Sequence, residues 1–369
     1  MPKIRVMVVD DAVVVRKLLA EALSNHPEIE VVATAANGKL ALAKIPVVNP
    51  DLIILDVEMP ELDGLATLSE LRKTWRDLPV IMFSSHTQAG AATTLEALQR
   101  GANDFVAKPT GMSSIAQSIE QVREQLISRI KVFCHHLRDH STVVRPAIRI
   151  PPTLPTHGQA VIPTVTAPVV RVPRGRIEIV VIGVSTGGPN ALAEMIPLLP
   201  KGLPVPVLIV QHMPPVFTRM LAERLSLKAQ LPVAEGVQGQ ILLPGHIHLA
   251  PGDWHMLVER NEGNLRLKLN QAPPENSCRP AVDPLFRSAA EVCGPNVLAV
   301  VMTGMGQDGT RGAQVLHELG AKVIVQDEAT SVVWGMPGAV VRAGIADQVL
   351  PLGQLAAEIS RRVLNGRIL

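Results

Sequence analysis

A serine stands in a short glycine-rich stretch that could perform nucleophilic chemistry. Residues 183–187 read GVSTG, follow a β-branched run and precede a proline. This G-x-S-x-G spacing is typical of a tight turn between a strand and a helix that exposes the serine hydroxyl. Small residues are needed on both sides because the turn brings backbone segments together and must leave room for a substrate carbonyl. The motif alone is often only structural, so Ser185 needs a base and an orienting acid.

Two further loops carry the partners that such a serine requires. His212 follows the apolar run VLIVQ, and Asp308 lies in the glycine-rich loop after VLAVV. Because the carboxyl ends of parallel strands meet at one edge of a sheet, we expect Ser185, His212 and Asp308 to converge. Taken singly, a packed or capping histidine and an Asp-Gly turn are common structural features. Together the three residues predict a catalytic triad, in a chain order unlike that of the α/β-hydrolases.

Two other interpretations of these residues are less well supported. A dinucleotide-binding turn needs glycine where Ser185 stands, and it needs an acidic residue about twenty residues further on, which the chain lacks. His246, His248 and His255 compete with His212 as the base. They lie on a stretch that reads as an antiparallel meander and not directly after an apolar parallel strand. His212 is therefore the preferred base.

Charged residues also gather at strand ends in the first part of the chain. Asp10 and Asp11 end the first apolar run, and Asp56, Ser84 and Lys108 end the third, fourth and fifth. Three carboxylates at one edge repel one another unless a cation lies among them, and their hard oxygen atoms suit Mg²⁺. A metal beside Asp56 would screen an incoming phosphoryl group, whose oxygens Lys108 could pair with. A role as a helix N-cap would explain the acid at position 11, but it would not explain why all five residues end strands at the same edge.

The segments that must position these residues alternate between strand and helix patterns. In the first part we expect strands at 4–11, 29–35, 50–60, 78–85 and 104–109, which together form a (βα)5 parallel sheet covered on both faces. In the second part we expect strands near 177–183, 205–211, 246–250, 254–259, 264–269, 297–302 and 322–326, with helices between most of them. The stretch 246–269 reads as an antiparallel meander on an otherwise doubly wound, mostly parallel α/β domain.

A proline-rich stretch separates the two parts. Seven prolines and no acidic residue lie between Ser141 and Ile177, which favours an extended spacer over helix or central strand. The sequence therefore predicts a first domain over residues 1–125, a helix end and linker over 126–176, and a second domain over 177–369.

Composition narrows the class of protein. The chain has 369 residues, a formal net charge of +2, no Tyr, three Trp and five Phe, so neither its charge nor its aromatic content favours nucleic-acid binding. Cys134, Cys278 and Cys293 match no disulfide framework or zinc spacing and are expected to be reduced. Because the chain shows no signal-peptide pattern and no apolar run of about 18–20 residues, we expect a cytoplasmic protein without membrane insertion.

Residues 4–125 resemble the receiver domain of two-component response regulators in the motifs VVDD, LDVEMPELDG, FSS and FVAKP. The resemblance implies that Asp56 is the phosphoacceptor and that Asp10, Asp11 and Asp56 surround Mg²⁺. It also implies switch or phosphate-pairing roles for three further residues, which are Ser84, Phe105 and Lys108.

Residues 177–365 resemble the catalytic domain of chemotaxis protein-glutamate methylesterases of the CheB type. The matching motifs include GVSTGGPNAL, QHMPPVFTRMLAERL, RPAVDPLF and TGMGQDGTRGA. The resemblance implies Ser185 as nucleophile, His212 as general base and acid, and Asp308 as the group that orients His212. It further implies oxyanion donors from the backbone near Thr186 and Met305.

The same resemblance implies partners and a reaction. Methylated chemoreceptors would be the substrate, a histidine kinase of a chemosensory pathway would be the phosphodonor, and the esterase site would need no cofactor. Phosphorylation would activate ester hydrolysis, and some relatives also deamidate glutamine. Two alternatives are a phospho-regulated adaptor without catalysis and a receiver-controlled serine hydrolase of other esters.

Overall fold

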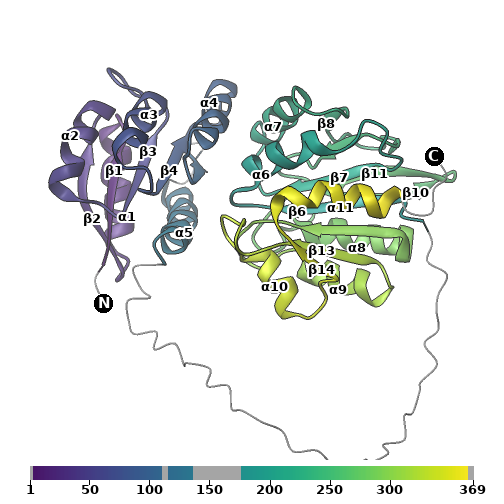
Figure 1. Ribbon diagram of the computed structural model, residues 1–369. Helices are drawn as coiled ribbons and strands as arrows, with labels where there is room; N and C mark the ends of the chain where they lie inside the picture. Colours follow the sequence, from purple (N-terminus) through teal and green to yellow (C-terminus); the bar gives the residue numbers. More distant parts are fainter. Residues whose placement is uncertain (1–2, 110–114, 136–175, 365–369) are drawn as a thin grey trace, which may run out of the picture.

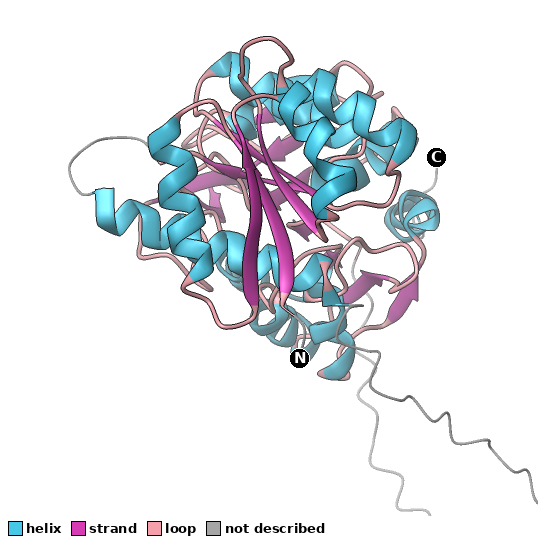
Figure 2. Ribbon diagram, turned by 90° about the vertical axis from the view of Figure 1, so that its left-hand side faces the viewer, coloured by secondary structure: helices cyan, strands magenta, loops and turns pink. Residues whose placement is uncertain are grey.

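The computed structural model describes residues 3–109, 115–135 and 176–364. Two parallel β-sheets with their helices organise these residues (Figures 1 and 2). The proline-rich stretch predicted as a linker lies outside the described residues from Ser141 to residue 175.

The first sheet contains five parallel strands in the order β2-β1-β3-β4-β5. Its elements are β1 (Ile4–Val9), α1 (Val13–Ser24), β2 (Ile29–Ala35), α2 (Gly38–Val48), β3 (Leu52–Asp56), α3 (Gly64–Thr74), β4 (Val80–Ser84), α4 (Gln88–Gln99), β5 (Asp104–Ala107) and α5 (Ile115–Phe133). Successive side chains of β1 point to opposite faces of the sheet and pack into two different hydrophobic cores. Val6 and Val8 pack with residues of α1 and α5, whereas Met7 and Val9 pack with residues of α2, α3 and α4. Burial on both faces explains why the strands are continuously apolar.

The second sheet contains seven parallel strands in the order β14-β13-β12-β6-β7-β9-β8. Its strands are β6 (Ile179–Val184), β7 (Val207–Gln211), β8 (Val233–Glu235), β9 (Ile247–Leu249), β12 (Val297–Val301), β13 (Lys322–Gln326) and β14 (Gln348–Leu350). The helices of this part are α6 (Gly188–Met195), α7 (Phe217–Ser226), α8 (Val282–Cys293), α9 (Thr310–Glu318), α10 (Met336–Arg342) and α11 (Leu352–Leu364). A separate antiparallel pair consists of β10 (His255–Asn261) and β11 (Asn264–Asn270).

The expected meander over 246–269 is only partly correct. The antiparallel pairing is confined to β10 and β11, whereas β9 lies inside the main sheet between β7 and β8 and is parallel to both. All three residues of β9 are buried, as in a strand covered on both faces, and the alternation of His246 and His248 concealed this. The short strands β8 and β14 and the helix α10 were not expected from the sequence either, and α3 was expected only as a member of the (βα)5 pattern, without a residue range.

In both sheets, strand addition passes from one side of the first strand to the other, between β1 and β3 in the first sheet and between β6 and β12 in the second. In open α/β sheets, sites form outside the carboxyl ends of the strands at such points. The loops after β1 and β3 carry Asp10 and Asp56, and the loops after β6 and β12 carry Ser185 and Asp308. The topology therefore places both groups of candidate residues where sites are expected.

Candidate active site

The serine turn is held by the neighbouring strand ends. The Ser185 backbone N–H donates to Thr303 O at 3.0 Å, and Gln211 Nε2 donates to Ser185 O at 3.0 Å. Gly187 has φ +80°, a conformation that glycine adopts without steric cost. A Cβ on Gly304 would lie 2.8 Å from the Ser185 Cβ, so the loop after β12 can approach the serine only with glycine there.

His212 and Asp308 form a direct pair. The distance from His212 Nε2 to Asp308 Oδ2 is 2.7 Å, and the two side chains are 11% and 2% exposed. An ionised carboxylate can only accept, so Nε2 carries the proton of this bond. A bond of this length between ionisable groups is typical of a strong, charge-assisted contact.

The Asp308 carboxylate lies at the N-terminus of α8. Its Oδ2 accepts from the backbone N–H of Val282 at 2.6 Å, and its Oδ1 accepts from those of Asp283 and Gly309 at 3.1 and 2.9 Å. These amides are among the groups that a helix leaves without internal partners, and the helix dipole favours a negative charge beside them. The Asp-Gly turn expected as an alternative role is present, and the same carboxylate also bonds to His212.

The charges of this pair follow from its surroundings. Burial raises the pKa of Asp308, but the bond to His212 and the amides of Val282 and Asp283 lower it below its ordinary value. Burial lowers the pKa of His212, but the nearby Cys278 and Asp308 side chains raise it, and the net shift is upward. Asp308 is therefore a carboxylate at neutral pH and favours the imidazolium form of His212.

The structure brings Ser185 to the same sheet edge as His212. The His212 backbone N–H donates to Val184 O at 3.2 Å, so the two residues follow directly paired strand ends. In the described part of the chain, the hydrogen bonds of Ser185 are made by its backbone, and none joins its hydroxyl to His212. The predicted chain of three groups is thus present in its His212–Asp308 half, and its serine half stays a prediction.

The two candidate oxyanion donors lie on either side of the serine. Thr186 follows Ser185 directly, and Met305 follows Gly304 on the adjoining loop. Over residues 3–109, 115–135 and 176–364, no hydrogen bond uses the backbone N–H of Thr186 or Met305. The predicted role of both amides as oxyanion donors stays a prediction.

The acidic residues of the first sheet form one cluster. Asp10, Asp11 and Asp56 each place a carboxylate oxygen within 4.8 Å of the others. Lys108 Nζ pairs with Asp10 Oδ2 at 2.9 Å and with Asp56 Oδ2 at 2.8 Å. Asp11 is not the cap of α1, because the helix begins after Ala12 without a side-chain cap. Three acids against one lysine leave a net negative charge with oxygen ligands, which fits a hard divalent cation.

Asp56 is the acid most affected by this cluster. Burial and the Asp10 carboxylate raise the pKa of Asp56, Lys108 lowers it, and the result is a pKa of about 6. Ser84 is buried at the end of β4 beside this strand end, and its hydroxyl donates to Gly90 O at 3.2 Å. The carboxylate is thus held in a form whose charge a nearby cation would stabilise.

Comparisons with known proteins agree with this arrangement. A family profile described as "CheB methylesterase" matches residues 180–359, and one described as "Response regulator receiver domain" matches residues 6–120. A relative from Trichodesmium erythraeum is 50% identical over 98% of this chain and 100% of its own length. A relative from a Nocardioides species is 51% identical over 100% of this chain and 97% of its own length. Both relatives carry the name "Protein-glutamate methylesterase/protein-glutamine glutaminase".

The chain belongs to the CheB methylesterase family. Its first part is a receiver domain and its second part is a methylesterase domain. A crystal structure of the Thermotoga maritima CheB methylesterase catalytic domain is 43% identical and covers 50% of this chain and 97% of that chain, with a TM-score of 0.49. In the described part of the chain, no helix is both long enough and apolar enough to cross a membrane.

The receiver domain contacts the methylesterase domain at the serine turn. Asp104 of β5 accepts a hydrogen bond from Thr186 Oγ1 at 3.0 Å, and it pairs with Arg129 of α5 at 2.9 Å. Thr186 and Asp104 are 4% and 7% exposed. The residue next to the candidate nucleophile is therefore bonded directly to the receiver domain.

Helices α4 and α7 extend the same contact. Phe105 stacks on Phe217, the first residue of α7, with ring centroids 4.6 Å apart. Asn190 Nδ2 of α6 donates to Leu98 O of α4 at 2.8 Å, and Arg224 of α7 bonds to Gln99 of α4. The predicted switch residue Phe105 thus lies at the boundary between the domains.

Several residues of these contacts were not singled out from the sequence. Asp104 and Phe217 lie inside an expected strand and an expected helix, and nothing in those patterns indicates a partner in another domain. Asn276, whose side chain bonds to Asp308 at 2.8 Å, lies in a stretch that carries no recognisable motif. Contacts of this kind depend on packing between distant segments, which periodicity does not report.

Proposed function

We propose that this protein hydrolyses methyl esters of glutamate side chains on chemoreceptors and that phosphorylation of its receiver domain controls the reaction. The observation that carries the proposal is the His212–Asp308 pair beside the Ser185 turn. It occurs in a chain that is half identical, over nearly its whole length, to relatives named for this activity. Esterase chemistry is assigned to residues 177–369 and phosphorylation to residues 1–125.

The reaction begins at the Ser185 hydroxyl. In its neutral form, His212 takes the hydroxyl proton at Nδ1 while Oγ attacks the ester carbonyl carbon. The carbonyl oxygen becomes an anion that the amides of Thr186 and Met305 would bind, and one such donor is typically worth about 10²–10³ in rate. His212 then gives its proton to the departing methoxide, which leaves as methanol and forms an acyl-serine. Attack by water, with the same proton route, releases glutamate and restores Ser185.

Asp308 supports both transfers without exchanging protons itself. It stays ionised because four donors besides His212 hold its carboxylate. Its charge stabilises the imidazolium that forms in each step, and its bond at Nε2 makes Nδ1 the ring nitrogen that would act as the base. The names of the relatives also include glutaminase activity. Attack on a glutamine side chain by the same groups would release ammonia, so we include deamidation in the proposal.

Asp56 is the proposed phosphoacceptor. Asp10, Asp11 and Asp56 would hold Mg²⁺, which when bound would neutralise charge on the incoming phosphoryl group. Lys108 already lies within 3 Å of Asp10 and Asp56 and would pair with the phosphoryl oxygens. Ser84 ends the neighbouring strand and is the proposed hydroxyl switch, with Phe105 as its aromatic partner. A histidine kinase of a chemosensory pathway is the proposed phosphodonor.

Regulation would act through access to Ser185. The receiver domain contacts Thr186, and a cavity of about 120 Å³ beside this contact is lined by residues of both domains. Its lining includes Gly187 of the serine turn, so the receiver domain borders Ser185 on this side. Phosphorylation at Asp56 would favour an arrangement in which the contact is broken. Because the proposed substrates are the cytoplasmic parts of receptors, the protein would act in the cytoplasm.

Methanol release from purified methylated receptor, with and without a small-molecule phosphodonor, tests the proposal. We expect release that the phosphodonor stimulates and that Ser185→Ala abolishes. Covalent labelling of Ser185 by a serine-directed reagent separates an enzyme from a non-catalytic adaptor. Turnover of small esters without any release from methylated receptor would instead identify a hydrolase of other esters, and the proposal would be wrong.

A further inference from the structure

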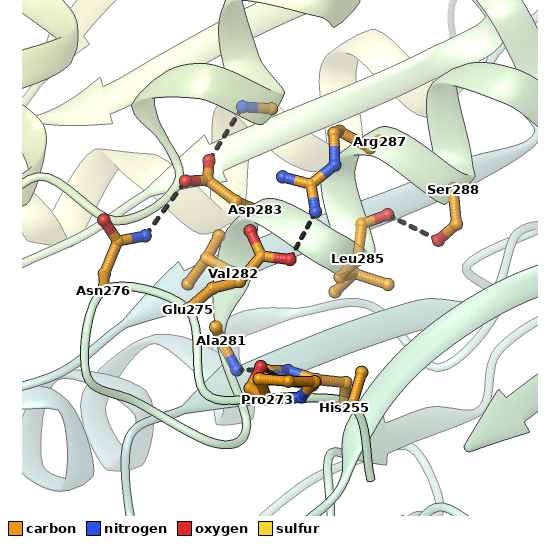
Figure 3. A network of polar contacts seen from close by, with 12 residues as sticks. His255, Pro273, Glu275, Asn276, Ala281, Val282, Asp283, Leu285, Arg287 and Ser288 are labelled. Carbon is orange, nitrogen blue, oxygen red and sulfur yellow. Dashed lines mark hydrogen bonds and ion pairs between the residues drawn. The ribbon is translucent and has the colours of Figure 1, made fainter. Parts of the chain in front are cut away.

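Asn276 lies in a tight turn beside the His212–Asp308 pair. Glu275 and Cys278 close the turn with two backbone hydrogen bonds of 3.1 and 2.9 Å, and a 2.6 Å ion pair joins Glu275 to Arg287 of α8 (Figure 3). Asn276 and Ser277 between them have φ values of +51° and +61°. Asparagine is among the residues that adopt this left-handed region most readily. The turn is therefore fixed on α8 in a conformation that suits asparagine.

The Asn276 side chain bridges two buried carboxylates. Its Nδ2 donates to Asp283 Oδ2 at 3.0 Å and to Asp308 Oδ1 at 2.8 Å, and Figure 3 shows its amide pointing toward Asp283. Asp283 and Asp308 are 1% and 2% exposed. An amide nitrogen carries two hydrogens, so one asparagine supplies a donor to each acid. Asn276 thus uses its full donor capacity on this pair of carboxylates.

The two acids influence each other's charge, and Asn276 bonds to both. Burial and the Asp308 charge raise the pKa of Asp283, whereas the Gly312 backbone N–H and Asn276 lower it. Like charges brought together out of water favour either protonation of one acid or rotation of a side chain. Either change at Asp308 would alter the acceptor that His212 meets. Asn276 shares Oδ1 with the backbone N–H groups of Asp283 and Gly309, while Oδ2 bonds to His212 Nε2 at 2.7 Å beside the Val282 N–H.

We propose that Asn276 is a positioning residue of the esterase site, which fixes the orientation of the Asp308 carboxylate and, through it, that of His212. The inference rests on the proposed function, because it assigns Asn276 to the same Ser185–His212–Asp308 reaction. Asn276 touches Asp308 and not the reacting atoms, so its effect must pass through the histidine.

Asn276→Gly in the full-length protein is the main test. Glycine accepts a positive φ, so the variant removes the amide and leaves the turn backbone unstrained. We expect kcat for methanol release to fall about tenfold, equivalent to about 1.4 kcal/mol, with KM changed less than about twofold, because the lost contact orients the base and does not bind substrate. A rise in KM at unchanged kcat would overturn the inference.

Asn296→Ala is the matched control. Asn296 Nδ2 donates to a carboxylate oxygen of Glu178 at 2.8 Å, a pair that is separate from the esterase residues. We expect this variant to keep the wild-type kcat and pH profile. An equal loss of kcat in both variants would show that removal of any such amide weakens the domain, and the inference would fail. Asn276→Asp, of the same size but with an acceptor in place of the donor, should lose at least as much activity as Asn276→Gly at about pH 8.

Titration of the His212 imidazole by NMR provides a readout that needs no turnover. Without the Asn276 donor, the Asp308 carboxylate can rotate or take up a proton, and either change weakens its support of the imidazolium. The pKa of His212 should therefore be lower in Asn276→Gly than in the wild type and unchanged in Asn296→Ala. An unchanged His212 titration in Asn276→Gly would refute the positioning role. A different result would refute the proposed function, namely a Ser185→Ala protein that still releases methanol.

Discussion

Asp104 offers a direct way to weaken the contact between the two domains. Its carboxylate accepts the Thr186 hydroxyl at 3.0 Å and pairs with Arg129 at 2.9 Å, and the residue is 7% exposed. The substitution Asp104→Ala removes the acceptor while leaving every residue of the methylesterase domain in place. We expect the unphosphorylated variant to release methanol faster than the unphosphorylated wild type.

The size of the effect follows from the bond that is lost. A hydrogen bond to a charged group contributes about 1.5–3 kcal/mol in a buried setting. At about 1.4 kcal/mol for each factor of ten, the ratio of closed to open molecules should fall by about 10- to 150-fold. The Phe105–Phe217 stack and the Asn190 bond to Leu98 O remain in the variant and keep part of the contact. The basal rate of methanol release should therefore rise in the variant. Its upper limit is the rate of a protein that is entirely in the open form.

The assay compares initial rates of methanol release with and without a phosphodonor. In Asp104→Ala the unphosphorylated rate should approach the stimulated wild-type rate, so the stimulation ratio should shrink. Arg129→Gln is the control, because it removes the ion pair inside the receiver domain and leaves the Asp104 acceptor for Thr186. Its basal rate should stay near that of the wild type.

An unphosphorylated Asp104→Ala protein with the wild-type rate and the wild-type stimulation ratio would refute this reasoning. An equal rise in Arg129→Gln would also refute it, because the effect would then come from a change within the receiver domain and not from the lost bond to Thr186.

Three further predictions concern the two sites themselves. Ser185→Ala should abolish methanol release and leave phosphorylation of the receiver domain intact, as phosphate incorporation would report; residual release at the wild-type rate would exclude Ser185 as nucleophile. Asp56→Asn should remove stimulation by a phosphodonor, and a variant that is still stimulated would contradict the assignment of Asp56. Because burial raises the pKa of Asp56 to about 6, protons should compete with Mg²⁺ below that pH, so the affinity measured by calorimetry should be weaker at about pH 5 than at about pH 8. Equal affinities would argue against Asp56 as a ligand.

The sequence predicted the strands that position the sites because those strands are buried on both faces. Runs such as residues 179–184 and 297–301 are continuously apolar for that reason, and the first polar residue beyond each run, Ser185 or Thr303, marks the edge of the sheet. The prediction was weakest for β9, where three residues are too few to show a period. There the alternating histidines favoured an antiparallel strand, and the parallel pairing with β7 and β8 could not be recognised.

The supporting contacts of the site could not be predicted in the same way. Asn276 bonds to Asp308, which is 32 positions away in the sequence. Asp104 bonds to Thr186, which is 82 positions away and lies in the other domain. In each case the sequence around the residue is compatible with an ordinary turn or strand. What decides its role is the packing of another segment against it, and single-sequence patterns contain no information on that packing.

Strand β5 connects the two sites within one short segment. Lys108, directly after it, pairs with Asp56 and Asp10 in the acidic cluster, whereas Asp104 and Phe105 at its start contact Thr186 and Phe217. A phosphoryl group on Asp56 would compete for the Lys108 ammonium and so act on the end of this strand. Thr186 follows the candidate nucleophile, and Phe217 begins the helix after the His212 loop. A single displacement of β5 would therefore reach both the serine side and the histidine side of the esterase site, which is why we expect one phosphorylation event to suffice for release.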